Sequence, residues 1–333
     1  MMSRTHNILI FGATGLIGEH ITSAILSQKD KFNRIVVFTS ENTIWTKSDE
    51  VDDLKRRGAE IIAGDFRSAS DVSEALEAAE TDTVVSCLGR PVIAAQANLI
   101  ECAAKNARVK RFFPSEYGTD VEFDETSKGE KPHQQKLKIR ELLRKVGNKE
   151  GKLEYTCVVT GPYGDADGGL YLGAKKVEDE EEGTFDVKRK RAVLLGADGE
   201  GKISLTTMRD VGKLVVAALL HPDGVRNKAI KVNSFTTTPK ALLEEFERQT
   251  GGEKWDVKYT SLERLEELER AAWEKGVPRA GTITLRRIWT SGKTLYEKRD
   301  NGLIGMEEGV DSVEDAVRQA VQVQMGQPDK KWA

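Results

Sequence analysis

A glycine-rich turn near the start of the chain constrains the fold more than any other feature. An apolar run at residues 7–11 predicts a buried strand, and residues 12–18 (GATGLIG) lead from it into a predicted helix that ends near Gln28. In such a turn Gly12 permits the tight bend, Gly15 lets the backbone approach a pyrophosphate, and Gly18 lets the helix pack on the strand. The sequence therefore predicts a dinucleotide site at which phosphates meet the free N–H groups of a helix.

Short strands and longer helices alternate through the first half of the chain. Runs rich in Val, Ile and Phe predict strands at 34–39, 60–63, 83–87, 110–114 and 154–160, with helices at 48–57, 72–79, 92–106 and 132–146 between them. This alternation is typical of a doubly wound parallel α/β sheet that is covered on both faces. We predict a Rossmann-type, NAD(P)-binding domain at residues 1–160, with its ligand across the carboxyl ends of the strands.

The second half is less regular and predicts a smaller α/β lobe, residues 161–333, that caps the cofactor cleft. Glycine and aspartate at 164–169 predict a loop, and the charge run at 175–191 predicts a solvated flap or helix face. Amphipathic helices are expected at 239–249, 262–275 and 311–324, with short strands around 230–232 and 257–259. We expect 203–220, a strand followed by a helix from near Met208, to return to the first domain.

The composition excludes several classes of function. Of the 333 residues, 38% are hydrophobic and 32% are charged, and the net charge of −3 is small, which is typical of a soluble globular protein. No basic stripe suggests a nucleic-acid partner, and no apolar run is long enough to span a membrane. The expected partner is a small molecule, and no large apolar face indicates an oligomeric state.

The cysteines and the N-terminal residues help to predict the cellular compartment of the protein. Cys87, Cys102 and Cys157 share no metal-ligand spacing, and three sparse cysteines do not suggest a disulfide framework. The chain enters its first strand without a signal-peptide pattern. We therefore expect a cytoplasmic protein without a metal site.

The end of the second strand bears on the choice between NAD and NADP. NAD sites tend to place an acid there for the ribose hydroxyls, whereas this chain has Phe38 followed by Thr39 and Ser40. These hydroxyls and the later Lys47 could hold a 2′-phosphate, so we favour NADPH over NADH. Glu41 is an acid close to the strand end, so NAD remains an alternative. Thr39 and Ser40 could equally be ordinary turn residues.

Two further strand ends predict cofactor contacts. Asp65 and Phe66 follow the third strand and are placed to flank the adenine, although a turn residue that caps a helix is an equally good interpretation. Leu88 and Gly89 follow the fourth strand on the route of the nicotinamide ribose. Cys87 beside them is better explained as a small packing residue than as a nucleophile.

Lys136 is the candidate catalytic residue. Short-chain dehydrogenases use a Tyr four residues before a Lys, but here that position is Pro132, which begins a predicted helix. A lysine in an apolar pocket beside a nicotinamide loses its proton more readily, so Lys136 could act as base, as proton donor or as a ribose contact. A solvated surface lysine is the alternative. We expect Lys138 and Arg140 to point elsewhere.

Three ordered motifs resemble a known family. Residues 12–18 (GATGLIG), 111–118 (RFFPSEYG) and 136–143 (KLKIRELL) together resemble the isoflavone reductase-like, NmrA-like branch of the atypical short-chain dehydrogenases, and in particular its fungal members. That branch includes the plant phenylcoumaran benzylic ether and pinoresinol–lariciresinol reductases. The resemblance covers about residues 7–163 and continues more loosely through 208–220 and 227–233.

The resemblance implies an NADPH-dependent reductase of aromatic or conjugated secondary metabolites. It implies that Lys136 is catalytic and also touches the cofactor, and that Glu116 in the PSE turn is a structural cap. The implied cofactor contacts in the glycine turn and beyond are Gly12, Thr14, Gly15, Leu16, Ile17, Gly18 and Gln96.

Departures from the plant pattern leave the substrate open. The arginine that plant reductases usually carry at the end of the second strand is missing, and residues 159–165 (VTGPYGD) replace the plant sequence after the sixth strand. Tyr163, Tyr171 and His133 are candidate substrate contacts, for each of which ordinary packing is the alternative. A dinucleotide-binding redox sensor without turnover and a non-redox biosynthetic enzyme remain alternative functions.

Overall fold

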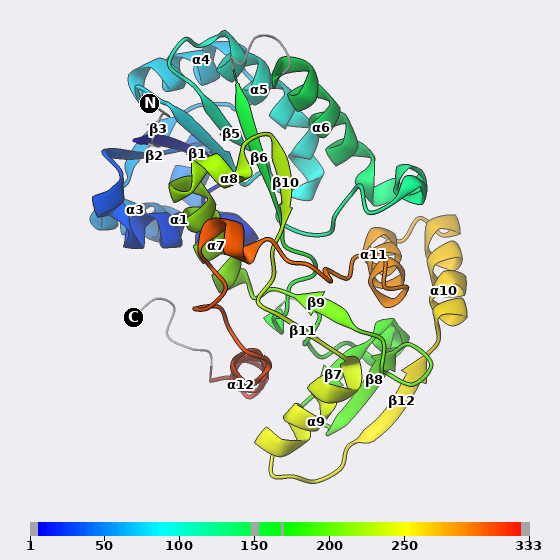
Figure 1. Ribbon diagram of the computed structural model, residues 1–333. Helices are drawn as coiled ribbons and strands as arrows, with labels where there is room; N and C mark the ends of the chain where they lie inside the picture. The colour runs from blue at the N-terminus through cyan, green and yellow to red at the C-terminus, as the bar shows by residue number, and fades with distance from the viewer. Residues whose placement is uncertain (1–5, 148–152, 168–169, 328–333) are drawn as a thin grey trace.

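A seven-stranded parallel sheet forms the centre of the protein (Figure 1). The computed structural model describes residues 6–147, 153–167 and 170–327. The strand order is β10-β6-β5-β4-β1-β2-β3, so the direction of winding reverses at β1. The strands are β1 Asn7–Phe11, β2 Arg34–Thr39, β3 Glu60–Ala63, β4 Thr83–Ser86, β5 Arg111–Phe113, β6 Glu154–Val159 and β10 Lys228–Lys231.

Helices cover both faces of this sheet because alternate strand residues point to opposite sides. In β1, Ile8 and Ile10 pack on one face with α1 (Leu16–Ser27), α3 (Ser48–Arg57) and α7 (Met208–Leu220). Leu9 and Phe11 pack on the other with α4 (Ala69–Ala78), α5 (Gln96–Lys105) and α6 (Gln134–Gly147). The prediction of a doubly wound parallel α/β sheet is confirmed.

A smaller lobe lies below the main sheet in Figure 1. It contains a two-stranded sheet, β11-β9, and a three-stranded sheet, β12-β8-β7, which share one apolar core with the helices around them. Its strands are β7 Thr184–Asp186, β8 Arg191–Leu195, β9 Ile203–Leu205, β11 Phe235–Thr237 and β12 Asp256–Thr260. Its helices are α9 Pro239–Gln249, α10 Leu262–Glu274, α11 Ala280–Thr290 and α12 Val313–Gln324.

Three parts of the second half differ from the sequence expectation or extend beyond what the structure describes. The strand near residue 230 is β10, which pairs in parallel with β6 at the edge of the main sheet instead of lying in the lobe. Of the stretch 203–220, which was expected to return to the first domain, the helix α7 packs against α1 on the main sheet, whereas the strand β9 pairs with β11 in the lobe. Of the loop expected at 164–169, positions 168 and 169 lie outside the described residues.

The charge run at 175–191 is not the solvated flap or helix face that was expected. It forms a 3-10 turn at Val177–Glu182, then β7 and the start of β8. Glu180 and Glu182 are buried because cations reach them from outside their own turn: Arg191 binds the first and Lys175 the second. Opposite charges close together along the run therefore allow these two carboxylates to be buried as ion pairs, while residues 176–178 and 188–189 stay exposed.

No helix in the described ranges is both long and apolar enough to cross a membrane.

The contact between α1 and α7 generates a test of the packing. A Cβ at Gly212 would lie 2.5 Å from the carbonyl oxygen of His20, whereas a Cβ at Gly201 would meet nothing within 4 Å. We expect Gly212→Ala to lower the free energy of unfolding by about 1–3 kcal/mol through overpacking. Urea denaturation measures this, with Gly201→Ala as the control expected to stay within about 0.5 kcal/mol. Equal effects at the two positions would contradict the close approach.

Candidate functional site

The glycine turn lies between β1 and α1, where the winding of the sheet reverses. Gly12 has φ +79°, and a Cβ there would lie 2.7 Å from the carbonyl oxygen of Cys87. A Cβ at Gly18 would lie 1.9 Å from the carbonyl oxygen of Gly12, so helix and turn are in direct backbone contact. Gly15 is the N-cap of α1 and supplies no side-chain cap. The N–H groups at Leu16 and Ile17, in the first helical turn, are therefore available to an outside acceptor such as a phosphate.

The segment after β2 brings a cation, Lys47, to this turn. Lys47 Nζ donates a hydrogen bond to the carbonyl oxygen of Thr14 at 2.6 Å. Ser40 caps the short helix α2 (Glu41–Thr46), since its hydroxyl accepts from the N–H of Thr43 at 3.1 Å. Thr39 ends β2 and is half-buried. Among these candidates, Lys47 is the one that the fold places directly against the glycine turn.

The candidates after β3 and β4 differ in their surroundings. Asp65 is exposed and its carboxylate accepts from the N–H of Arg67 at 2.9 Å, which is a local turn contact. Phe66 is half-buried beneath the guanidinium of that arginine. Leu88 is buried and its backbone N lies 3.2 Å from the position of a Cβ at Gly12, while Gly89 is exposed. The backbone after β4 therefore lies against the glycine turn.

A depression of about 480 Å³ lies beside the ends of β2 and β3. Glu41, Ile44, Trp45, Ser48 and Ala63 line it, and Trp45 is 83% exposed. Tryptophan is seldom this exposed. The free indole face of Trp45 can stack with a planar ring. Trp45 was not among the residues predicted from the sequence, although an aromatic residue a short distance beyond a strand end was the available signal.

The loop after β5 is hydrogen-bonded to the start of α5 and to the segment after β6. The side chain of Gln96 accepts from the N–H of Ser115 at 2.7 Å, and the carbonyl oxygen of Gly118 accepts from the N–H of Gly161 at 2.9 Å. Gln96 is fully buried. Its amide oxygen therefore supports the loop, and any cofactor contact from this residue stays a prediction.

The two candidate tyrosines are also engaged within the protein. The Tyr163 hydroxyl donates to the carbonyl oxygen of Tyr117 at 2.6 Å, so its ring remains half-buried beside the loop. Tyr171 is buried in the core of the lobe, where its ring lies near Trp289 and the guanidinium of Arg286. Of the two, Tyr163 is the nearer to the loop after β5.

Glu116 and Arg140 form a fully buried ion pair beneath this loop. Arg140 donates from Nε and Nη2 to one oxygen of Glu116, at 3.0 and 2.7 Å, and from Nη1 to Glu122 at 2.9 Å. The expectation that Arg140 points away from the site is wrong, because it is four residues from Lys136 and shares its helix face. Glu116 is a partner in this ion pair and caps none of the helices in the described residues. The i, i+4 spacing of Lys136 and Arg140 was the signal that was missed.

Lys136 lies in the first turns of α6 and points over the loop after β5. Its Nζ is 4.0 Å from the position of a Cβ at Gly118, and it has no hydrogen bond or ion pair with the described residues. Burial lowers the pKa of Lys136; the negative charge of Glu116 opposes this shift, and the positive charges of Arg90 and Arg140 add to it. A lysine in this setting gives up a proton more easily than a surface lysine.

His133 lies three residues before Lys136 and is buried. Its Nδ1 lies 2.9 Å from the hydroxyl oxygen of Ser127, and Phe123 contacts its ring edge to face. Burial lowers the pKa of His133 to about 4, helped by the charges of Lys136 and Arg90. The imidazole is therefore neutral at pH 7.

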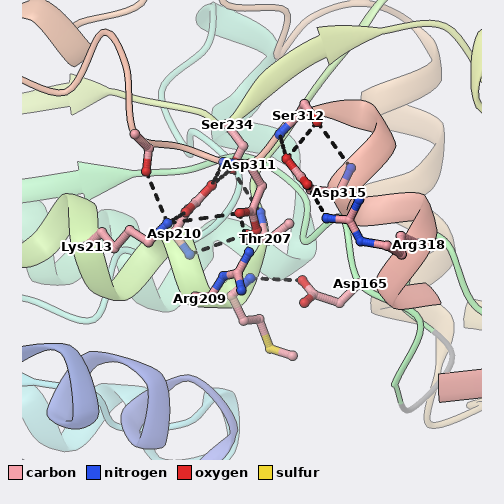
Figure 2. Close-up of polar contacts among 12 residues, drawn as sticks. Asp165, Thr207, Arg209, Asp210, Lys213, Ser234, Asp311, Ser312, Asp315 and Arg318 are labelled. Atoms are coloured by element: carbon pink, nitrogen blue, oxygen red, sulfur yellow. Dashed lines mark hydrogen bonds and ion pairs between the residues drawn. The ribbon is translucent and has the colours of Figure 1, made fainter. Parts of the chain in front are cut away.

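A buried carboxylate cluster joins α7 to the segment before α12 (Figure 2). Asp210 accepts from the hydroxyl of Ser234 at 2.5 Å, from the N–H of Asp311 at 2.6 Å and from Lys213 at 2.7 Å. The Thr207 hydroxyl, which belongs to the N-cap of α7, donates to Asp311 at 2.7 Å. The cluster thus fastens the C-terminal segment to a helix of the main sheet.

The fold and the turn together define a class: a doubly wound α/β protein with an uncapped glycine-rich helix start at its switch point. A family model described as the NmrA-like family matches residues 4–286, and the chain belongs to this family. The resemblance inferred from the three motifs is confirmed.

Named relatives are reductases and oxidoreductases. Oxidoreductase aprR of Aspergillus flavus is 29% identical over 82% of this chain and 83% of its own length. The isoflavone reductase of Pisum sativum is 28% identical over 72% of this chain and 75% of its own length. These names agree with the prediction of an oxidoreductase.

Solved structures share the fold. The binary complex of leucoanthocyanidin reductase with NADPH from Vitis vinifera has a TM-score of 0.77 at 20% identity, covering 94% of this chain and 99% of that one. A crystal structure of isoflavone reductase has a TM-score of 0.72 at 22% identity, covering 95% and 99%. At these identities the likeness shows the fold.

Asp165, on the loop after β6, generates a test by pH. Its carboxylate accepts from the N–H of Met208 at 2.9 Å, and burial, together with the nearby carboxylates of Asp167, Asp311 and Asp210, raises its pKa to about 7. The folded state then holds a proton that the unfolded state has released, so stability is lost as pH rises from about 4 to about 7.

Asp165→Asn mimics the protonated acid and keeps the acceptor for Met208. We expect its Tm advantage over the unmodified protein to grow between these pH values and to level off above them. Thermal unfolding across this pH range measures the effect, with the exposed Asp198→Asn as the control. A constant difference at all pH values would contradict the raised pKa.

Proposed function

We propose that this protein is an NADPH-dependent reductase that transfers a hydride to an aromatic or conjugated small-molecule secondary metabolite. One observation carries the proposal: the Lys136 ammonium has no partner among the described residues and lies at the same edge of the sheet as the uncapped glycine turn. Both follow the carboxyl ends of parallel strands, which is where doubly wound sheets bind their ligands.

The residues present fit a nicotinamide dinucleotide. The close backbone approach at Gly12 and Gly18 leaves no space for a side chain, and the first turn of α1 offers N–H groups to a pyrophosphate. Lys47 beside Thr14, with no acid at the end of β2, supports NADPH over NADH, although Glu41 begins α2 close by. A leucoanthocyanidin reductase of the same fold is described as a complex with NADPH.

When bound, the dinucleotide supplies the hydride. As the substrate carbon accepts it, an electron pair moves onto a conjugated oxygen, and Lys136 donates a proton to that oxygen and becomes neutral. The lowered pKa of Lys136 eases this donation. Named relatives include isoflavone and phenylcoumaran benzylic ether reductases, which supports an aromatic substrate. Tyr163 and His133 lie beside the loop under Lys136 and remain the proposed substrate contacts, with Tyr171 deeper in the lobe.

Replacing Lys136 tests the proposed reaction. With a panel of phenolic and enone compounds, we expect the unmodified protein to oxidise NADPH and Lys136→Met to lose roughly 100-fold or more of kcat, since a positioned proton donor contributes about that much. NADPH binding, measured by calorimetry, should persist. Lys138→Met, an exposed position on the same helix, is the matched control. Tight NADPH binding without oxidation of any compound would overturn the reductase and favour a dinucleotide-binding sensor.

Replacing Lys47 tests the cofactor preference. Loss of one charge-assisted hydrogen bond to a 2′-phosphate should raise the Kd for NADPH about tenfold in Lys47→Met. The Kd for NADH, which lacks that phosphate, should change much less. Calorimetric titration of both dinucleotides measures the difference, with the exposed Lys55→Met as the control. An equal loss for both would show that Lys47 only supports the glycine turn.

A further inference from the structure

The hydrogen bonds of Ser127 fix the tautomer of His133. The Ser127 hydroxyl donates to the carbonyl oxygen of Val121 at 2.5 Å. A serine has one O–H hydrogen, so the contact between Ser127 Oγ and His133 Nδ1, at 2.9 Å, takes its hydrogen from the imidazole. The neutral ring therefore carries its proton on Nδ1, and Nε2 carries a lone pair.

This lone pair has no donor within the described part of the chain. Nε2 is buried and unpartnered, and the whole side chain is 1% exposed. The T-shaped contact with Phe123 holds the ring in place, with the centroids 5.7 Å apart. Protonation of Nε2 is disfavoured, because burial and the charges of Lys136 and Arg90 lower the pKa of His133 by more than a hydrogen bond with the Ser127 backbone and the charge of Asp120 raise it. The nitrogen is thus a fixed hydrogen-bond acceptor.

Lys136 supplies a hydrogen-bond donor that complements this acceptor. His133 closes the 3-10 turn Lys131–His133 that leads into α6, and Lys136 follows in the first turn of that helix, close enough for its charge to act on the imidazole. The lysine presents N–H donors without an acceptor, and the histidine presents an acceptor without a donor. A hydroxyl group satisfies both, since its oxygen accepts from the ammonium and its hydrogen is donated to the imidazole. A carbonyl or an ether satisfies only the lysine.

We propose that His133 Nε2 and Lys136 Nζ together form a site for a hydroxyl group, so that the ligand presents a phenol, an enol or an alcohol there. His133 is then a residue that determines specificity by accepting a hydrogen bond from the ligand. This inference rests on the proposed function for the location of the substrate, and in the proposed reaction the hydroxyl is the enol that forms when Lys136 protonates the conjugated oxygen.

Phenol and anisole are the probes, because they differ in the hydrogen that His133 would accept. In the full chain labelled with ¹⁵N-histidine, NMR at neutral pH should show His133 as the Nδ1–H tautomer. Phenol at millimolar concentration should shift the Nε2 resonance of His133 and bind more tightly than anisole, whereas anisole should leave that resonance unchanged. His221, in a separate contact with the carbonyl oxygen of Ala217, is the internal control.

Variants separate acceptance of a hydrogen bond from packing. His133→Phe keeps a ring against Phe123 and removes the acceptor, so phenol affinity should fall about tenfold, to the level of anisole. Ser127→Ala removes the partner of Nδ1, so the Nε2–H tautomer should appear and the preference for phenol should weaken. His221→Phe should change neither, and circular dichroism checks that each variant is folded.

Three results would overturn the inference: an Nε2–H tautomer in the unmodified protein, equal binding of phenol and anisole, or no shift of His133 with phenol at tens of millimolar. None of these readouts uses a dinucleotide or turnover. A protein that fails to oxidise NADPH but discriminates phenol from anisole through His133 would therefore contradict the proposed reductase and leave the hydroxyl site standing.

Discussion

The buried pair between Arg140 and Glu116 is the interaction on which the site depends. It joins α6 to the loop after β5, and neither charge is reached by solvent. Loss of one partner leaves the other buried without compensation, which typically costs about 3–5 kcal/mol. The pair therefore fixes the register of α6 against that loop. Lys136, one turn before Arg140, is held over Gly118 as a result.

The sequence was most informative where local chemistry decides the structure. The glycine turn, the apolar strands and the helices between them follow from backbone sterics and from the two-residue period of β1, which sorts Ile8 and Leu9 to opposite cores. The charge run at 175–191 was misjudged for the opposite reason. The burial of Glu182 depends on Lys175 within the run and also on Arg279, the N-cap residue of α11, which lies far away in the sequence.

The same division applies to the candidate site. Lys136 and the glycine turn could be located by motif, because each is defined by its own segment. The engagement of Gln96 with Ser115 and of Tyr163 with Tyr117 could not, since these are contacts between segments far apart in the chain. The sequence gives even less indication that His133 Nε2 is a hydrogen-bond acceptor. That property depends on the Ser127 hydroxyl donating its one hydrogen to the carbonyl oxygen of Val121.

The cluster around Asp210 limits how the protein can open. The carboxylate of Asp210 on α7 accepts from the hydroxyl of Ser234, from the backbone amide of Asp311 and from Lys213 on its own helix, and α12 then packs into the core of the lobe. Swinging the whole lobe away from the sheet would remove the hydroxyl of Ser234 and the amide of Asp311 from this buried carboxylate at once. We therefore expect the contact around Asp210 to stay closed when small molecules enter. Entry should need only local movement of the segments farthest from α7, and not separation of the two halves.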